Sequence, residues 1–330
     1  MRCICRDAGQ RTEAKAMSIE IRTAAPSADL SITSGDWVRL LCLSVLWGGS
    51  FFFAGVAVKE LPPLTIVFVR VGLAALLLLP LIRIYRIPVP TTFAGWRPFI
   101  VMALLNNVLP FSLLVSGQTM IASGLASVIN AMTPVFTVLV LAAFGEERLI
   151  ARRVAGVLLG LFGVIVLRGV DLHVDTQQSF GILLCLGATV VFGFSALWAK
   201  REMQGVEPLA AATFQLICSS VMMFVLSMVV DRPWQLPMPQ ATTVLALVGL
   251  AALSTSLAYI LFFQIIRGSG PGNVMLVTLL VPVTAIALGY VVLGEVVTPR
   301  EIIGALIIAS GLLIMDGRLL SRFATPPASR

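Results

Sequence analysis

The stretch "PVFTVLVLAAFGEERLIARRVAGVLLGLFG", residues 134–163, decides the fold, because the chain repeats its framework 148 residues later. The second copy, "PVTAIALGYVVLGEVVTPREIIGALIIASG", spans residues 282–311 and aligns without a gap. Glycines, prolines and glutamates recur in one register, at Gly124/Gly272, Pro134/Pro282, Glu147/Glu295, Gly156/Gly304, Gly163/Gly311 and Gly169/Gly317. Apolar composition alone does not produce such a register, so the sequence predicts an internal repeat.

Around the repeat, ten stretches of about 20 residues carry almost no charge, and this length lets a helix cross the hydrocarbon core. They lie near 37–56, 64–84, 98–117, 123–144, 152–169, 179–199, 208–229, 242–263, 272–292 and 301–317. The chain is 58% hydrophobic and 12% charged, whereas soluble domains are about 25% charged. The runs do not alternate in polarity as the strands of a transmembrane barrel do. We predict an all-α integral membrane protein with ten transmembrane helices.

The repeat divides the ten spans into two sets of five. The similarity reaches the earlier helices, since "PLTIVFVR" (63–70) aligns with "PLAAATFQ" (208–215). An odd number of spans per half gives the halves opposite orientations, which is the inverted-repeat architecture of secondary transporters. The predicted parts are a polar basic tail at 1–36, a first repeat at 37–169, a second repeat at 170–317 and a C-terminal tail at 318–330.

The distribution of Lys and Arg predicts the orientation in the membrane. With both termini in the cytoplasm, 18 of the 23 basic residues lie on the cytoplasmic side and four lie outside, in agreement with the positive-inside rule. The net charge of +7 then reflects a basic face toward anionic lipids, so no nucleic-acid partner is predicted. We expect a multi-pass plasma-membrane protein. Residues 1–16 precede a second methionine, Met17, and are expected to be dispensable.

Two further motifs lie in the first two spans, "LWGGSFFFAG" at 46–55 and "VFVRVGLAALLLL" at 67–79. With the repeated segments, they make the chain resemble the EamA-type ten-helix members of the drug/metabolite transporter superfamily over roughly 37–317. The resemblance implies movement of small metabolites, often amino acids or related compounds, by alternating access without ATP hydrolysis. It favours export and a bacterial inner-membrane location.

Arg70 is the one ionisable residue inside a predicted span and away from its ends. Such residues are costly in a membrane and are functional candidates by default. Two interpretations remain open. At about 10 Å below the outer surface, the side chain can snorkel to water or headgroups. Alternatively, it can face the interior and offer its planar fork to a carboxylate, or to backbone carbonyls of a neighbouring helix. The aligned residue of the second repeat is Gln215.

Pro134 and Pro282 lie near the middle of the fourth and ninth spans and are hinge or gate candidates, because each removes a backbone hydrogen bond. At a similar depth, several helices carry polar or aromatic side chains that could line a substrate cavity. With Arg70 and Gln215, these candidates are Trp47, Asn106, Asn107, Asn130, Thr133, Ser256 and Tyr259. The alternative for each polar residue is an interhelical hydrogen bond.

Glu147 and Glu295 precede the fifth and tenth helices, where a carboxylate stabilises the positive N-terminal end of a helix. The fifth helix also carries Gly156, Gly160 and Gly163, a small-residue face suited to close packing. This face can pack within the chain or join two copies in a homodimer.

The content of the spans separates three classes of function. A membrane-embedded enzyme needs a nucleophile, a metal cluster or a carboxylate pair at membrane depth, but acidic residues occur only in loops, tails or helix ends. We therefore predict no enzyme, metal site or cofactor, and no buried carboxylate to carry a proton. The preferred function is secondary transport of a small molecule, with membrane lipid as the other partner. A channel or facilitator for small solutes is the alternative.

Overall fold

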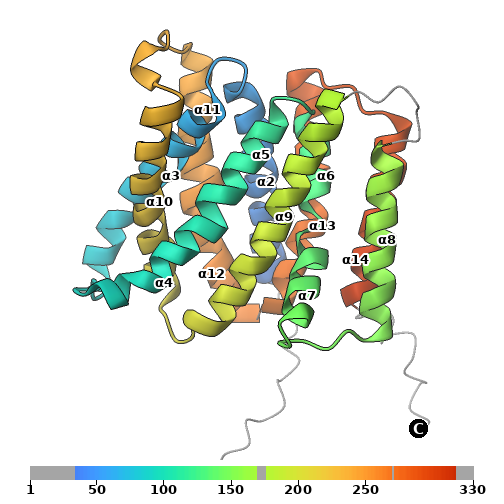
Figure 1. Cartoon of the computed structure of the whole chain (residues 1–330), viewed down its shortest axis with the longest axis horizontal. Coiled ribbons are helices and arrows are strands. Elements are labelled where there is room, and N and C mark those ends of the chain that lie inside the picture. The colour runs from blue at the N-terminus through green and yellow to red at the C-terminus, as the bar shows by residue number, and fades with distance from the viewer. Residues whose placement is uncertain (1–33, 169–175, 270, 317–330) are drawn as a thin grey trace, which may run out of the picture. The chain divides into compact units, whose positions relative to one another are not determined.

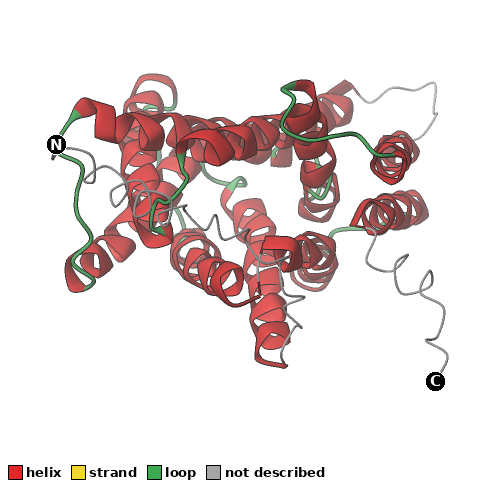
Figure 2. Cartoon of the chain, turned by 90° about the horizontal axis from the view of Figure 1, so that it is seen from below, coloured by secondary structure: helices red, strands yellow, loops and turns green. Residues whose placement is uncertain are grey.

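The computed structural model describes residues 34–168, 176–269 and 271–316, and within them every regular element is a helix (Figures 1 and 2). The first half contains α2 (Ser34–Ala57), α3 (Pro63–Ile84), α4 (Phe93–Ala103), η1 (Leu104–Val108), α5 (Leu109–Gln118), α6 (Ser123–Asn130), α7 (Thr133–Ala143) and α8 (Ala151–Arg168). The second half contains α9 (Thr176–Glu202), α10 (Pro208–Val230), η2 (Pro233–Gln235), α11 (Ala241–Ala251), η3 (Ala252–Leu257), α12 (Ala258–Ser269), α13 (Pro271–Leu288), η4 (Gly289–Leu293) and α14 (Pro299–Asp316). The predicted terminal tails lie almost entirely outside the described residues.

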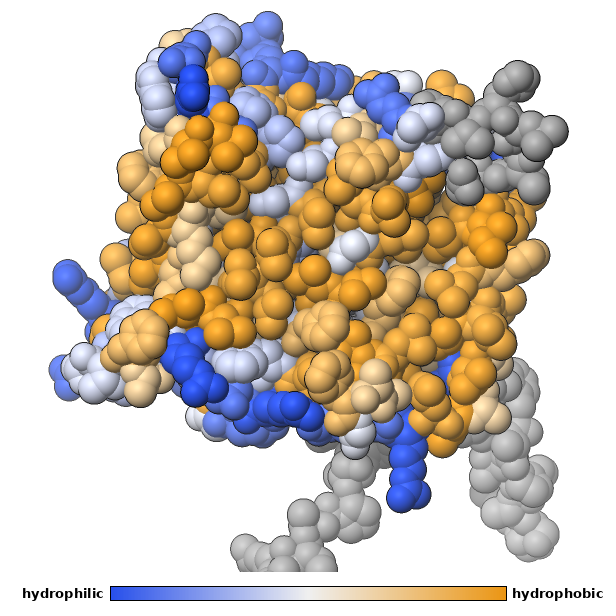
Figure 3. Space-filling view, in the orientation of Figure 1, coloured by the Kyte–Doolittle hydropathy of each residue, from blue (hydrophilic) through white to orange (hydrophobic). Residues whose placement is uncertain are grey.

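The surface carries the pattern of a membrane protein. On the face drawn in Figure 3, a hydrophobic band covers the middle of the helices and hydrophilic residues collect at its upper and lower edges. Large apolar side chains point outward, for example Leu158 and Ile165 of α8, which are 62% and 61% exposed. A large exposed apolar surface marks contact with a membrane or with another protein, and the membrane-length apolar helices favour the membrane. The structure therefore confirms an integral membrane protein.

In the described residues, seven helices are long and apolar enough to span a membrane, and they match the first four and the sixth to eighth predicted spans. The ninth is a shorter apolar helix over Val277–Leu293. The fifth and tenth correspond to α8 and α14, which are 18 residues long. Each of these two carries three charged residues, all near its ends, so their apolar part is shorter than the sequence suggested.

Helices from the two halves pack side by side. The pairs α2 with α13, α3 with α10, and α8 with α14 make the most extensive contacts in the described chain. Glycine allows the closest approach between α2 and α13: a Cβ on Gly48 would lie 2.6 Å from Thr284 Cβ and 2.9 Å from the Val281 carbonyl oxygen. The first glycine of "LWGGSFFFAG" thus helps to join the halves.

The glycine face of α8 packs within the chain. A Cβ on Gly156 would lie 2.6 Å from the carbonyl oxygen of Gly311, and one on Gly163 would lie 3.0 Å from that of Gly304. These α14 glycines are the aligned residues of the second repeat, so each half supplies one side of the contact. The face is occupied by α14 and does not support a homodimer.

The two prolines of the repeat lie in different local structures. The fourth span is divided into α6 and α7 by Ala131 and Met132, and Pro134 is the second residue of α7. In contrast, Pro282 lies inside the continuous helix α13. The alignment predicted equivalent bends at these positions, whereas the first copy is broken and the second copy stays helical.

Candidate functional site

Arg70 faces the interior of the helix bundle. It lies on α3, it is 7% exposed, and its Nε–H donates to Thr255 Oγ1 of η3 at 3.0 Å. The guanidinium carbon also lies 3.7 Å from the ring centroid of Phe111 on α5, a cation–π contact. This position excludes the snorkelling interpretation, because the charged end is directed toward other helices.

The guanidinium of Arg70 keeps most of its hydrogen-bonding capacity. Arginine has five N–H donors, and only Nε–H has an acceptor in the described part of the chain. No described carboxylate forms an ion pair with it. A buried cation without a counterion is costly unless a ligand or water supplies acceptors, so this site favours a negatively charged group.

Beside Arg70, a network of neutral polar side chains joins three helices. Asn106 Nδ2 donates to Gln215 Oε1 and to Tyr259 Oη, both at 3.2 Å, and the Tyr259 hydroxyl donates to Asn107 Oδ1 at 3.4 Å. Asn107 Nδ2 in turn donates to Ser219 Oγ at 2.9 Å. Four of the predicted cavity residues therefore contact one another directly.

The network is connected to Arg70 by helical spacing. Thr255 and Tyr259 are four residues apart on η3 and α12, and Asn107 and Phe111 are four apart on η1 and α5. Residues with this spacing lie on the same helix face. Arg70 therefore lies between two faces that both carry members of the amide network.

Both faces pass through π-helical segments, and these begin 148 residues apart, at Leu104 in η1 and Ala252 in η3. A π-helical turn inside an α-helix is uncommon and is often found at functional sites. Here η1 carries Asn106 and Asn107, and η3 carries Thr255. The sequence contains no local signal for either segment beyond the register of the repeat.

We call Arg70, Phe111, Thr255 and the amide network the Arg70 cluster. The other predicted cavity residues make different contacts. The Trp47 ring packs on Phe262 with centroids 5.5 Å apart. Ser256 Oγ donates to the Ala251 carbonyl of its own helical span at 3.0 Å and to the Ala74 carbonyl of α3 at 3.4 Å. At the break between α6 and α7, Thr133 Oγ1 donates to the Asn130 carbonyl at 2.7 Å, and the buried Asn130 Oδ1 has no hydrogen-bond partner in the described part of the chain.

A cavity of about 250 Å³ lies elsewhere, between α6, α13 and α14. It contains the hinge candidate Pro282, and its other lining residues are apolar, among them Val128, Ile286 and Leu306. None of the Arg70 cluster lines it. Its chemistry suits an apolar group rather than a charged one.

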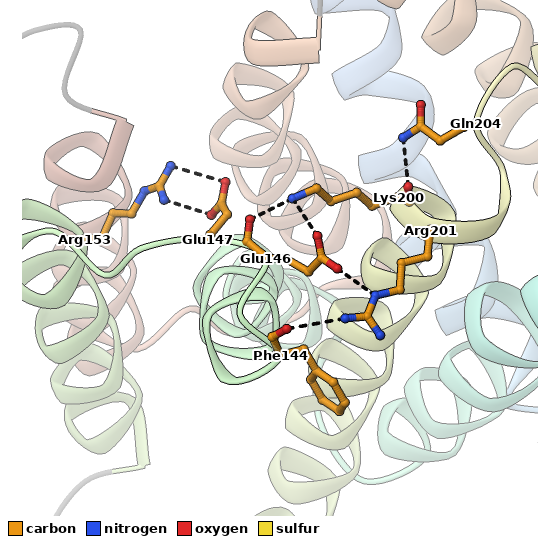
Figure 4. A network of polar contacts seen from close by, with 7 residues as sticks. All are labelled: Phe144, Glu146, Glu147, Arg153, Lys200, Arg201 and Gln204. Atoms are coloured by element: carbon orange, nitrogen blue, oxygen red, sulfur yellow. Dashed lines mark hydrogen bonds and ion pairs between the residues drawn. The ribbon is translucent and has the colours of Figure 1, made fainter.

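Glu295 does not stabilise its own following helix, α14. Instead it reaches the N-terminus of α6: Ser123 N–H donates to Oε1 at 2.8 Å, and Ser123 Oγ and Gly124 N–H donate to Oε2 at 2.9 and 3.2 Å. Glu147 forms a two-point ion pair with Arg153, whose Nη1 and Nη2 lie 2.9 and 3.4 Å from the two carboxylate oxygens (Figure 4). The carboxylate–helix pairing of Glu295 crosses between the halves, which local sequence could not indicate.

Sequence reasoning missed several residues that contact Arg70 or the amide network. It did not include Thr255, Phe111, Ser195 or Ser219 among the cavity candidates. Ser195 Oγ donates to Asn106 Oδ1 at 3.1 Å, and Ser219 lies one turn after Gln215. The spacing of Ser219 from Gln215 was readable in the sequence, but the approach of Phe111 depends on how α3 and α5 pack.

Comparisons with known proteins agree with these features. The EamA-like transporter family matches residues 37–169 and, a second time, residues 179–315. A Bacillus subtilis protein described as the uncharacterized transporter YoaV is 24% identical over 278 residues, which cover 83% of this chain and 94% of that protein. A Salmonella typhimurium protein described as a probable amino-acid metabolite efflux pump is 29% identical over 297 residues, covering 84% of this chain and 94% of that protein. One crystal structure superposes with a TM-score of 0.61 at 20% identity, covering 89% of this chain and 100% of that one, which shows a shared fold.

Proposed function

This chain belongs to the EamA-like transporter family, and on that premise we propose that it exports small carboxylate-bearing metabolites, such as amino acids or related amphiphilic compounds, by alternating access. Membership makes it a membrane transporter with a small-molecule substrate. The relatives are described as transporters and not as enzymes. The substrate class, the direction and the mechanism are our proposal.

The observation that carries the substrate class is the buried guanidinium of Arg70. Its only described hydrogen-bond partner is the neutral Thr255, so a carboxylate on the substrate would supply the missing counterion. A planar carboxylate can accept two parallel hydrogen bonds from the Nη groups. The amide and hydroxyl groups of Asn106, Gln215 and Tyr259 would then bind the polar remainder of the substrate, and Phe111 would contact its apolar part.

Alternating access is supported by the two-fold organisation of the chain. The family model matches twice, the π-helical segments recur at the same spacing, and aligned glycines of α8 and α14 face each other. We propose two inverted five-helix repeats with ten spans, in which α8 and α14 are the fifth and tenth. The proposed repeats are 37–169 and 170–317, with tails at 1–36 and 318–330 in the cytoplasm.

Within this mechanism, Pro134 and Pro282 are the proposed hinges. The break between α6 and α7 already separates two helical arms around Asn130, whose side-chain oxygen lacks a partner among the residues that the structure describes. Export is favoured because the Salmonella relative is described as an efflux pump. A bacterial inner membrane is the proposed location.

A flux assay in proteoliposomes tests the proposal. Labelled amino acids, organic acids and their neutral analogues are offered with an imposed proton gradient switched on and off. We expect saturable flux of carboxylate compounds and acceleration by unlabelled substrate on the opposite side. Non-saturable flux without counter-transport would indicate a channel. Arg70→Ala is expected to insert normally and to lose transport, and Arg70→Lys to recover little because it lacks the planar fork.

A further inference from the structure

At one end of the helix bundle, carboxylates from one half bind helix N-termini of the other half. Thr65 N–H and Oγ1 of α3 donate to Asp231 Oδ2 at 2.7 and 2.9 Å, and Gln240 N–H, at the start of α11, donates to Glu60 Oε2 at 2.9 Å. The contacts of Glu295 with α6 are of the same kind. The helices α3, α6 and α11 all begin at the upper end in Figure 1. Each contact complements the positive helix end with a charge, and each spans the two halves.

The lower end has a different chemistry. There Glu146 binds Lys200 and Arg201, at 3.2 and 2.7 Å, and Glu147 binds Arg153 (Figure 4). These are carboxylate–cation pairs: the Glu146 pairs join the first half to α9 of the second, and the Glu147 pair lies within one half. Contacts between the halves therefore occur at both ends. Among the described residues, carboxylates bind helix N-termini across the halves at the upper end, which is the outer end in the proposed orientation.

The register of the repeat indicates where a second partner of Glu147 would lie. Glu295, the residue aligned with Glu147, binds the N-terminus of α6 at Ser123 and Gly124. The residues aligned with Ser123 and Gly124 in the second repeat are Pro271 and Gly272, which begin α13. Proline has no N–H, so the equivalent site on α13 offers fewer donors than α6.

Position 301, aligned with Arg153, is Glu301, which binds Thr298 in its own loop. Glu295 therefore has no arginine at the position that corresponds to Arg153, whereas Glu147 forms an ion pair with Arg153 itself.

Glycine makes room for the Glu295 contact. A Cβ on Gly289 would collide with Glu295 Oε2, and the Glu295 N–H donates to the Gly289 carbonyl at 3.0 Å. Gly294, which directly precedes Glu295, has φ of +67°, a left-handed conformation suited to glycine. The aligned residue of Gly289 in the first repeat is Leu141. The second repeat is therefore built to hold its carboxylate against α6.

We propose that Glu295 is the positioning residue that closes the outer end, that Glu147 closes the inner end by binding the N-terminus of α13, and that Arg153 holds Glu147 away while the outer end is closed. This inference rests on the proposed alternating access. In this cycle the outer end and the inner end are closed in turn and never together. The ion pair of Arg153 with Glu147 favours closure of the outer end.

Thiol labelling tests the proposal without a substrate. The reporter is Ser127→Cys, one turn below Ser123 on α6 and fully buried, in a chain whose five native cysteines are replaced. A membrane-impermeant maleimide is added from each side of vesicles in turn. Glu295→Gln is expected to raise labelling from the side where α6 begins by about tenfold or more, since each lost hydrogen bond to a charged group is worth about that factor. Gly289→Ala displaces the same carboxylate without removing its charge and is expected to act in the same direction.

The control is Glu301→Gln, which removes a carboxylate whose described hydrogen bond is local, to Thr298 just before α14. Labelling of Glu295→Gln and Gly289→Ala at the rate of this control would overturn the role of Glu295. Arg153→Gln is expected to raise outer labelling only while Glu147 is present, so the double variant with Glu147→Gln should return to the rate of Glu147→Gln alone. An additive double variant would overturn the role of Arg153. Because labelling needs no transport, a flux screen that finds no substrate would count against the proposed function and leave the gate contacts standing.

Discussion

Arg70 and Thr255, 185 positions apart, are joined by a buried hydrogen bond of 3.0 Å between Nε and Oγ1. The bond connects α3 of the first half to the π-helical segment η3 of the second. It orients the guanidinium over Phe111 and leaves the Nη donors for another acceptor. The carboxylate specificity proposed for this transporter depends on that orientation.

Thr255→Val therefore weakens substrate binding while the charge of Arg70 remains. Valine has the same shape but offers no acceptor to Nε–H, so we expect about a tenfold or larger rise in the substrate concentration for half-maximal flux. The matched control is Thr213→Val, because the buried Thr213 Oγ1 has no partner among the described residues and its loss should leave flux unchanged. Equal effects of the two substitutions would contradict the orienting role of Thr255.

Tyr259→Phe is expected to destabilise the protein through the amide network. The hydroxyl accepts from Asn106 and donates to Asn107, and its removal leaves buried amide groups without partners at a cost of about 1–3 kcal/mol. Thermal unfolding in detergent measures the change. Tyr85→Phe is the control, since Tyr85 is 68% exposed at the end of α3. An unfolding midpoint unchanged from wild type would show that the network adds no stability.

Gly163→Ala tests the close contact of α8 with α14. The new Cβ would lie 2.7 Å from Ile308 Cγ1 and 3.0 Å from the Gly304 carbonyl oxygen, so the helices must separate, at about 1–3 kcal/mol. Gly187→Ala is the comparison, because the nearest atom to its Cβ is Leu113 Cδ1 at an ordinary 3.7 Å. We expect a lower unfolding midpoint for the first variant only. A stable Gly163→Ala protein would mean that the pair does not need this glycine.

Glu146 gives the lower loop a pH-dependent stability. Hydrogen bonds from Arg201 and then Lys200 hold the pKa of this carboxyl below its usual value of 4.5. A lowered pKa stabilises the folded state above the usual value, and the contribution disappears as the pH falls through the folded value. The unfolding midpoint of wild type should exceed that of Glu146→Gln at pH 7, and the two should converge below about pH 4.5. Parallel curves from pH 7 to 3 would contradict this.

The sequence predicted the membrane-length apolar helices well, because they follow from hydrophobic length. The positions of glycine, proline and glutamate predicted an internal repeat, and the family model matches the chain twice. It also selected Arg70, Asn106, Asn107, Gln215 and Tyr259, which the structure brings into one cluster. It could not decide whether Arg70 snorkels, since the direction of a side chain around a helix depends on the packing of neighbours such as Phe111.

The partners of Glu147 and Glu295 were beyond the reach of the sequence for a related reason. Position before a helix predicted that each carboxylate would stabilise that helix. The loop after η4 instead turns back at Gly294 and brings Glu295 to α6, while Arg153 in the first turn of α8 binds Glu147. The partner of Glu147 is a nearby opposite charge in the sequence, and the partner of Glu295 is brought to it by tertiary packing.

The measurement that tests the central claim most directly compares carboxylates with their carboxamides as competitors of flux, in proteoliposomes holding wild type or Arg70→Gln. The two members of each pair differ only in the group that would bind the guanidinium. We predict that wild type prefers the carboxylate by about tenfold or more and that Arg70→Gln, inserted in equal amount, shows no preference. Equal competition in wild type, or a preference that survives in Arg70→Gln, would contradict a carboxylate site at Arg70.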